Sequence, residues 1–163
     1  MADELLLALT AVAALGGVGI VGGALFRRYY RARFDFTFAD KSDKLHLNMG
    51  EDRKICIEIT NQSRGQGRKI EAGFVYVPSS FTLTKAEAEG SPVAIIQLFP
   101  EATTGRFANY RYVSLPQFYF SRRESSPMCV NVKTPSSGGL FKVFIVLHLE
   151  DTSVEGSLTL AVS

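Results

Sequence analysis

The residues of this chain best suited to chemistry are two cysteines, Cys56 and Cys129. Each lies among apolar residues typical of a strand, and three states are open to the pair. Both can be reduced and buried, which is common for free cysteine, or the two can form a disulfide in an oxidising compartment. A zinc site needs more ligands than the chain offers. The sequence favours the reduced, buried state.

The two histidines, His46 and His148, alternate with leucines in predicted strands, which indicates solvent-facing or edge positions. Cys129 is followed by no histidine at short spacing, so a copper site is not expected. A further set of acids does not match the spacing of a calcium loop and is interpreted as a turn. We therefore expect neither a metal nor a cofactor. The acids are Asp35, Asp40 and Asp43.

Catalytic motifs are missing from the sequence. It contains neither a Gly-x-Ser-x-Gly elbow nor a Cys–His pair within one segment. The glycine-rich run at residues 64–68 lacks the strand–loop–helix context and the Lys-Ser/Thr ending of a phosphate-binding loop. The run is interpreted as a flexible basic hairpin loop, and the chain is predicted not to be an enzyme.

Residues 107–112 and 118–123 are rich in aromatic side chains and arginine, the types enriched at binding hot spots. They can form a surface for a partner protein. Alternatively, every second residue belongs to the core and the tyrosines cover an edge. The candidate partner surface consists of Tyr110, Arg111, Tyr112, Tyr119, Arg122 and Arg123.

The elements that position these residues begin with an apolar run. From Leu5 to Phe26 there is no charge and no proline. A helix of this length reaches roughly 33 Å, enough to cross a hydrocarbon core of about 30 Å. We predict a short tail at residues 1–4 and one transmembrane helix at residues 5–26. A buried soluble helix, a cleaved signal peptide and a pilin-like stalk are the alternatives, and the acidic start at Asp3 and Glu4 does not fit a signal peptide.

The predicted helix is rich in small residues. In lipid, small side chains let a neighbouring helix approach closely, so packing drives association. We therefore expect the helix to pack within a homo-oligomer or a larger membrane complex, although glycine is also common in transmembrane helices generally. The candidate packing residues are Ala13, Gly16, Gly17, Gly19 and Gly23.

A basic juxtamembrane segment at residues 27–33 follows the helix. Positive residues tend to stay cytoplasmic, so the sequence favours a cytoplasmic domain. The sequon Asn61-Gln62-Ser63 and the cysteine pair favour the extracytoplasmic side instead. Arginines can also bind anionic lipid headgroups, so membrane lipids are expected partners. The predicted membrane-interface residues are Arg27, Arg28, Tyr29, Tyr30, Arg31 and Arg33.

The charge of the chain is unevenly placed. The net charge is +2, and it is fully accounted for by the four juxtamembrane arginines less Asp3 and Glu4. From Phe34 on, acidic and basic residues therefore balance. A neutral domain has no general attraction for nucleic acid, so no nucleic-acid partner is expected.

Residues 34–163 alternate between apolar and polar side chains in short runs bounded by Gly, Pro and Ser. This pattern predicts an all-β fold, an antiparallel sandwich of about nine strands. A short helical turn is expected at residues 84–89. The candidate strands are 34–38, 45–49, 54–60, 70–77, 81–83, 93–99, 107–115, 118–120, 128–132, 140–149 and 158–162.

Two spans carry a resemblance to a known family. Leu45 to Asn61 contains a strand, a glycine turn, a strand and a terminal asparagine, and Ser126 to Val162 contains three strands joined by Thr-Pro, Gly-Gly and an acidic turn. Together they resemble immunoglobulin-like domains of the cell-adhesion-related and fibronectin-III-like kind. The chain lacks their core tryptophan and tyrosine corner. The resemblance implies an immunoglobulin-like sandwich that binds proteins or sugars.

Two functions fit these features. The favoured hypothesis is a non-enzymatic accessory or scaffold subunit of a membrane complex, which packs through its glycine-rich helix and contacts other subunits through the sandwich. The alternative is an extracytoplasmic adhesion, envelope-binding or pilin-like filament protein.

Overall fold

The computed structural model describes residues 31–64, 67–92, 95–96 and 105–163. Ala32–Ser163 forms one compact unit built from two sheets. Within the described ranges, no helix is long and apolar enough to cross a membrane. The predicted span at residues 5–26 and its packing residues lie outside those ranges.

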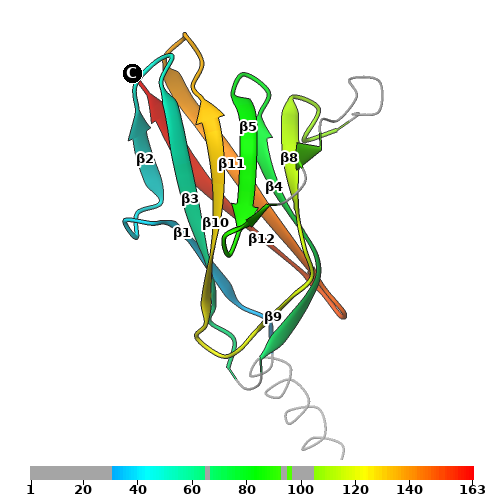
Figure 1. Ribbon diagram of the computed structural model, residues 1–163. Coiled ribbons are helices and arrows are strands. Elements are labelled where there is room, and N and C mark those ends of the chain that lie inside the picture. Colours follow the sequence, from blue (N-terminus) through cyan, green and yellow to red (C-terminus); the bar gives the residue numbers. More distant parts are fainter. Residues whose placement is uncertain (1–30, 65–66, 93–94, 97–104) are drawn as a thin grey trace, which may run out of the picture. The chain divides into compact units, whose positions relative to one another are not determined.

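The first sheet has five strands, and Figure 1 shows its central strands crossing in front of the second sheet. All of its pairings are antiparallel. Its strands, in spatial order, are β1 (Phe34–Phe38), β3 (Asp52–Asn61), β10 (Ser125–Lys133), β5 (Thr82–Ala88) and β6 (Ser91–Pro92).

The second sheet has seven strands. β9 (Phe118–Phe120) pairs with the beginning of β4, next to the β4–β8 pairing. The other strands, in spatial order, are β2 (Lys44–Leu47), β12 (Ser153–Val162), β11 (Gly139–Leu149), β4 (Arg68–Pro78), β8 (Tyr110–Leu115) and β7 (Ile95–Ile96).

The core lies between the sheets and is made by alternate residues of the long strands. A fully buried aliphatic side chain of this kind stabilises the fold by about 1.5–3 kcal/mol. The prediction of an all-β sandwich, made from the alternating sequence pattern, is therefore confirmed. The inward-facing residues include Ile55, Ile57 and Ile59 on β3, Met128, Val130 and Val132 on β10, Val75 and Val77 on β4, and Val143, Ile145 and Leu147 on β11.

One pairing departs from the expected antiparallel arrangement. β2 runs parallel to β12, with Lys44 opposite Thr159 and Leu47 opposite Val162. The chain thus passes from the edge of the first sheet, at β1, to the edge of the second. Alternation shows which residues face the core but not the direction of the neighbouring strand, so the sequence could not reveal this pair.

The predicted helical turn at residues 84–89 is wrong, because residues 84–88 continue β5 and Glu89 begins the turn that follows it. Leu83, Ala86 and Ala88 are buried against the core. The register with β10 shifts here, so that Lys85 pairs with Asn131 but Leu83 pairs with Val132. The extra residue separates two buried positions by three, which imitates the spacing of a helix.

Several strand boundaries differ from those expected. β10 and β12 begin earlier, at Ser125 and Ser153, and β8 begins later, at Tyr110. Residues 105–109 form turns, in which Tyr110 donates its backbone N–H to the carbonyl of Phe107. The described residues contain twelve strands rather than about nine. Of the short edge strands, β7 and β9 lie within the candidate strands 93–99 and 118–120, and only β6 matches no candidate.

Candidate functional site

The outer face of the second sheet carries a cluster of half-buried aromatic side chains. Phe74 and Tyr76 on β4 lie beside Tyr112 on β8, with ring centroids 5.5 Å apart for Phe74 and Tyr112. Phe107, from the turn before β8, stacks on Tyr76 with centroids 4.0 Å apart and planes at 10°. We call this cluster the aromatic face; it consists of Phe74, Tyr76, Phe107, Tyr110, Tyr112 and Phe144.

A charged group borders the aromatic face. The guanidinium of Arg106 lies 4.6 Å from the ring centroid of Phe144 and 5.3 Å from that of Phe107. Its Nη2 also forms a 2.6 Å ion pair with Oε1 of Glu155 on β12. Stacked rings beside a guanidinium offer flat apolar area together with fixed polar contacts, the combination that protein-binding hot spots use.

The aromatic face exists because two strands of the second sheet are apolar on both sides. Val75 and Val77 point into the core, while Phe74 and Tyr76, at the alternate positions of β4, point outward. Phe144 takes the outward position on β11 between two core residues. Sequence reasoning missed these three aromatic residues, although a continuous apolar run is the signal of a strand covered on both faces.

Burial within the aromatic face shifts the ionisation of the Tyr76 phenol. Burial raises the pKa of the Tyr76 phenol above its ordinary value of 10.0, and the neighbouring Tyr112 phenol raises it further. The neutral, hydrogen-bonding form of Tyr76 is thus held to higher pH than in water.

The structure divides the predicted partner surface into two parts. Tyr110 and Tyr112 belong to the aromatic face, whereas Arg111 alternates with them along β8 and points to the other side of the sheet. Tyr119 on β9 is 64% exposed. It lies near the end of the domain where the turn after β9 carries the remaining two residues, Arg122 and Arg123.

A basic cleft of about 570 Å³ opens at that end. There β1 begins, β3 ends, and the chain turns from β9 into β10 (Figure 1). The cleft brings together arginines that are far apart in the sequence, and Asp35 is the one acidic residue in its lining. The lining residues are Arg33, Phe34, Asp35, Gln62, Ser63, Arg64, Arg122 and Arg123.

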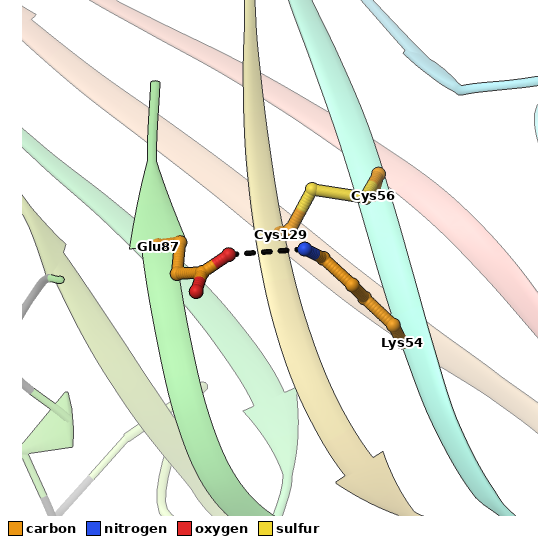
Figure 2. Close-up of a disulfide and its surroundings, with 4 residues drawn as sticks. All are labelled: Lys54, Cys56, Glu87 and Cys129. Carbon is orange, nitrogen blue, oxygen red and sulfur yellow. Dashed lines mark hydrogen bonds and ion pairs between the residues drawn. A yellow bond between two sulfur atoms is a disulfide. The ribbon is translucent and has the colours of Figure 1, made fainter. Parts of the chain in front are cut away.

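Cys56 and Cys129 form a disulfide, so the expectation that both are reduced and buried is wrong. They are direct partners in the register of β3 and β10, with Cα atoms 4.0 Å apart. Both alternate with core residues and are half-buried on the outer face of the first sheet. Figure 2 shows the sulfur–sulfur bond bridging the two strands.

A charged pair crosses the sheet beside the disulfide. Lys54 Nζ donates to Oε2 of Glu87 at 3.0 Å, reaching from β3 over β10 to β5 (Figure 2). Lys85 pairs with the other carboxylate oxygen. Hydrogen bonds from Lys85 and Lys54, together with their charges, lower the pKa of Glu87 to about 2.

Asn61, the acceptor of the sequon, is 0% exposed. Its Nδ2 donates to the carbonyls of Phe120 and Ser121, at 3.2 Å each, and its Oδ1 accepts the backbone N–H of Ser63 at 3.0 Å. The side chain therefore holds the turn together by hydrogen bonds, and because it is buried it is not accessible for glycosylation. The sequon therefore gives no support to an extracytoplasmic domain.

Neither histidine is part of a metal site in the described residues, where no group of three or more potential ligands occurs. His46 and His148 are both exposed, as expected. His148 Nδ1 lies 2.8 Å from Oγ of Ser153, its direct cross-strand partner, so the hairpin register explains this contact. Asp40 accepts hydrogen bonds from Ser42 in a turn, as the sequence indicated.

The predicted membrane-facing residues are only partly described. Arg31 and Arg33 are exposed. The helix-packing residues, from Ala13 to Gly23, and the interface residues from Arg27 to Tyr30 lie outside the described ranges.

No protein-family model and no curated protein sequence matches the chain. Among solved structures, a protein from Corynebacterium diphtheriae described as membrane-anchored matches with a TM-score of 0.50 and 7% identity, over 82% of this chain and 36% of that chain. The bacterial hydrophobin BslA matches with a TM-score of 0.44 and 16% identity, over 81% and 95%. BcpA, the major pilin subunit of Bacillus cereus, matches with a TM-score of 0.41 and 9% identity, over 82% and 41%. Similarity at such low identity concerns the fold alone, an all-β domain.

Proposed function

We propose that the chain is a non-enzymatic, membrane-anchored β-sandwich that presents its aromatic face to a partner protein on the extracytoplasmic side. The observation that carries this proposal is the half-buried disulfide between Cys56 and Cys129, on the outer face of the first sheet. A disulfide that is not sealed in the core can be attacked by the thiols that keep the cytosol reducing, whereas it persists in an oxidising compartment.

The basic segment after the predicted helix favours the opposite orientation. Positive charge biases the insertion of a helix, whereas a disulfide is a covalent bond of the folded domain. We give the disulfide priority because arginines near a membrane have a second use, the binding of lipid phosphate.

The proposed fold is an immunoglobulin-like variant. The order β1-β3-β10-β5 in one sheet and β12-β11-β4 in the other corresponds to the A-B-E-D and G-F-C orders of immunoglobulin constant-type domains. The disulfide differs, since it joins neighbouring strands of one sheet instead of the two sheets. Such a scaffold supports binding surfaces on its faces and ends, in line with the aromatic face.

A protease site placed after Ser163, which is exposed, tests the proposal. Protease added to intact cells, after removal of any outer wall or membrane, is expected to release a tag attached behind the site. Release only after permeabilisation would place the domain in the cytoplasm and overturn the proposal. A cytoplasmic protein carrying the same site and tag is the control for leakage.

The second candidate is an accessory subunit held by its helix. The small-residue face of the predicted span, Gly16, Gly19 and Gly23, favours it. Replacing Gly19 and Gly23 with leucine is expected to remove co-purifying membrane subunits if this packing operates. The matched change of Leu6 and Leu7 to alanine adds no bulk to the helix.

A further inference from the structure

The arginines of the basic cleft are available for a ligand. Arg33, Arg64, Arg122 and Arg123 are all exposed. None of them forms an ion pair with another described residue. Against these four positive charges the lining holds a single carboxylate, that of Asp35, which accepts the backbone N–H of Phe36. The cleft therefore carries a net positive charge although the domain as a whole is neutral.

The segments that carry these arginines are fixed by buried hydrogen bonds. Asn61 ties the turn after β9 to the end of β3, because its backbone N–H donates to Glu124 and its carbonyl accepts from Arg123, both at 2.9 Å. Ser63, 1% exposed, binds the other segment: its Oγ accepts the backbone N–H of Arg33 at 2.9 Å. Two buried polar side chains thus hold three strand ends around one opening, which fixes the backbone that carries the arginines.

The backbone at Arg123 adopts a left-handed conformation within the turn from Ser121 to Glu124, in which the N–H of Glu124 donates to the carbonyl of Ser121 at 3.2 Å. Its φ is 62°, in the left-handed region where glycine is favoured. An arginine side chain at this position is exposed and contributes no burial. The turn thus places Arg123 in the lining of the cleft.

We propose that the basic cleft binds the phosphate group of an anionic membrane lipid. A guanidinium presents planar pairs of N–H donors that match two phosphate oxygens, so it recognises phosphate by geometry as well as charge. Several guanidinium groups around an opening of about 570 Å³ suit a compact headgroup.

The position of the cleft in the chain indicates a lipid as the source of the phosphate. This step depends on the membrane anchor of the proposed function. Arg33 follows Phe26, the last residue of the predicted span, by seven residues. An extended chain of that length covers at most roughly 25 Å, so the cleft is tethered within reach of the headgroups. Arg27, Arg28 and Arg31, in the intervening segment, are expected to add to the attraction.

Native mass spectrometry of the full chain in a neutral detergent tests the proposal. Phosphatidylglycerol and phosphatidylcholine with identical acyl chains are titrated separately, and inorganic phosphate is used as a competitor. We expect phosphatidylglycerol to bind more tightly than phosphatidylcholine and binding to weaken as salt is raised. The double variant Arg122→Gln/Arg123→Gln is expected to lose about thirtyfold in affinity for phosphatidylglycerol.

Two further variants keep the test informative. Lys44→Gln/Lys133→Gln removes the same charge from exposed positions outside the cleft lining and is expected to leave the affinity within about twofold. Arg122→Lys/Arg123→Lys keeps the charge but removes the paired donors, and it is expected to give an intermediate loss. An intact disulfide and unchanged circular dichroism confirm that each variant is folded.

Three outcomes would overturn the inference: equal loss in the cleft and control variants, equal binding of the two lipids, or binding of inorganic phosphate without binding of phosphatidylglycerol. The result is independent of orientation, because anionic lipids can be supplied to the purified chain directly. Failure here therefore leaves the extracytoplasmic assignment standing, and a cytoplasmic domain found by the protease test leaves the lipid site standing.

Discussion

Cys56 on β3 and Cys129 on β10 are bonded to each other directly across two neighbouring strands. They are 73 positions apart in the sequence, and the segment between them contains β4 to β9. One bond on the outer face of the first sheet thus closes a loop that includes a large part of the second sheet.

Removing this bond is expected to destabilise the domain. For a loop of this length the chain-entropy model gives about 4 kcal/mol of lost stability, because the unfolded state regains its freedom. The variant Cys56→Ala/Cys129→Ala in urea denaturation measures the effect. Wild-type protein in reductant is expected to match the variant, and reductant is expected to leave the variant unchanged. Equal stability of variant and oxidised wild type would contradict this prediction.

The ion pairs of Glu87 are expected to stabilise the domain in a pH-dependent way. The pKa of this carboxyl is lowered from 4.5 to about 2 in the folded state by Lys85 and Lys54. Its stabilisation is therefore fully present above pH 4.5 and is lost as the pH falls toward 2. The difference in unfolding free energy between wild type and Glu87→Gln is expected to shrink across that window. A difference that stays constant from pH 6 to about 2 would contradict the assignment; Glu71→Gln, at a carboxylate 3.7 Å from Lys69, is the control.

Asn61 is expected to be essential to the turn and to carry no glycan. Replacement by alanine leaves two carbonyls and one N–H without their partner, at a cost of about 3 kcal/mol in unfolding free energy. Alanine at the neighbouring exposed Gln62 is expected to change stability by less than about 0.5 kcal/mol. Similar effects of the two substitutions, or a sugar on Asn61 in the mature protein, would show that the turn is built differently.

Tyr76 is expected to ionise later than an ordinary tyrosine. Burial is the main reason that its pKa is raised above 10.0. Because the unfolded phenol ionises first, the raised pKa lowers stability as the pH climbs past 10.0. Ultraviolet titration of tyrosinate is expected to show a late phase that Tyr76→Phe removes and Tyr119→Phe keeps. Loss of the late phase in Tyr119→Phe but not in Tyr76→Phe would contradict this prediction.

The aromatic face is expected to hold the partner protein. Tyr112→Ser shortens an outward side chain that contacts Phe74 and Tyr76. It is expected to weaken partner binding by roughly tenfold or more, the scale of a hot-spot residue. Crosslinking in membranes followed by mass spectrometry measures the loss. Tyr119→Ser, at an aromatic residue 64% exposed outside the aromatic face, is the matched control, and equal effects of the two changes would move the binding surface elsewhere.

Much of the fold follows from local patterns. Successive side chains of a strand point to opposite faces. The alternation around Ile55 and Ile57 and the apolar length of β11 therefore predict the core correctly. The bulge at residues 83–86 defeats the same reasoning, since it breaks the alternation without changing the element.

The candidate site depends on register, which one sequence does not contain. Cys56 and Cys129 have suitable neighbours for a buried or a bonded state, and only the pairing of β3 with β10 decides between them. Tyr112 meets Tyr76 because β4 and β8 pair in one particular alignment. Asn61 is the opposite example. The sequence shows a glycosylation sequon there, but in the structure the asparagine side chain is buried in a turn.

The redox state of the cysteines in living cells shows whether the domain lies in an oxidising compartment. Cells are quenched with acid, free thiols are alkylated, and the intact mass of the full chain is measured with and without prior reduction. Cys56 and Cys129 are expected to take up alkylating agent only after reduction. Alkylation of both cysteines without reduction would contradict an extracytoplasmic, disulfide-bonded domain.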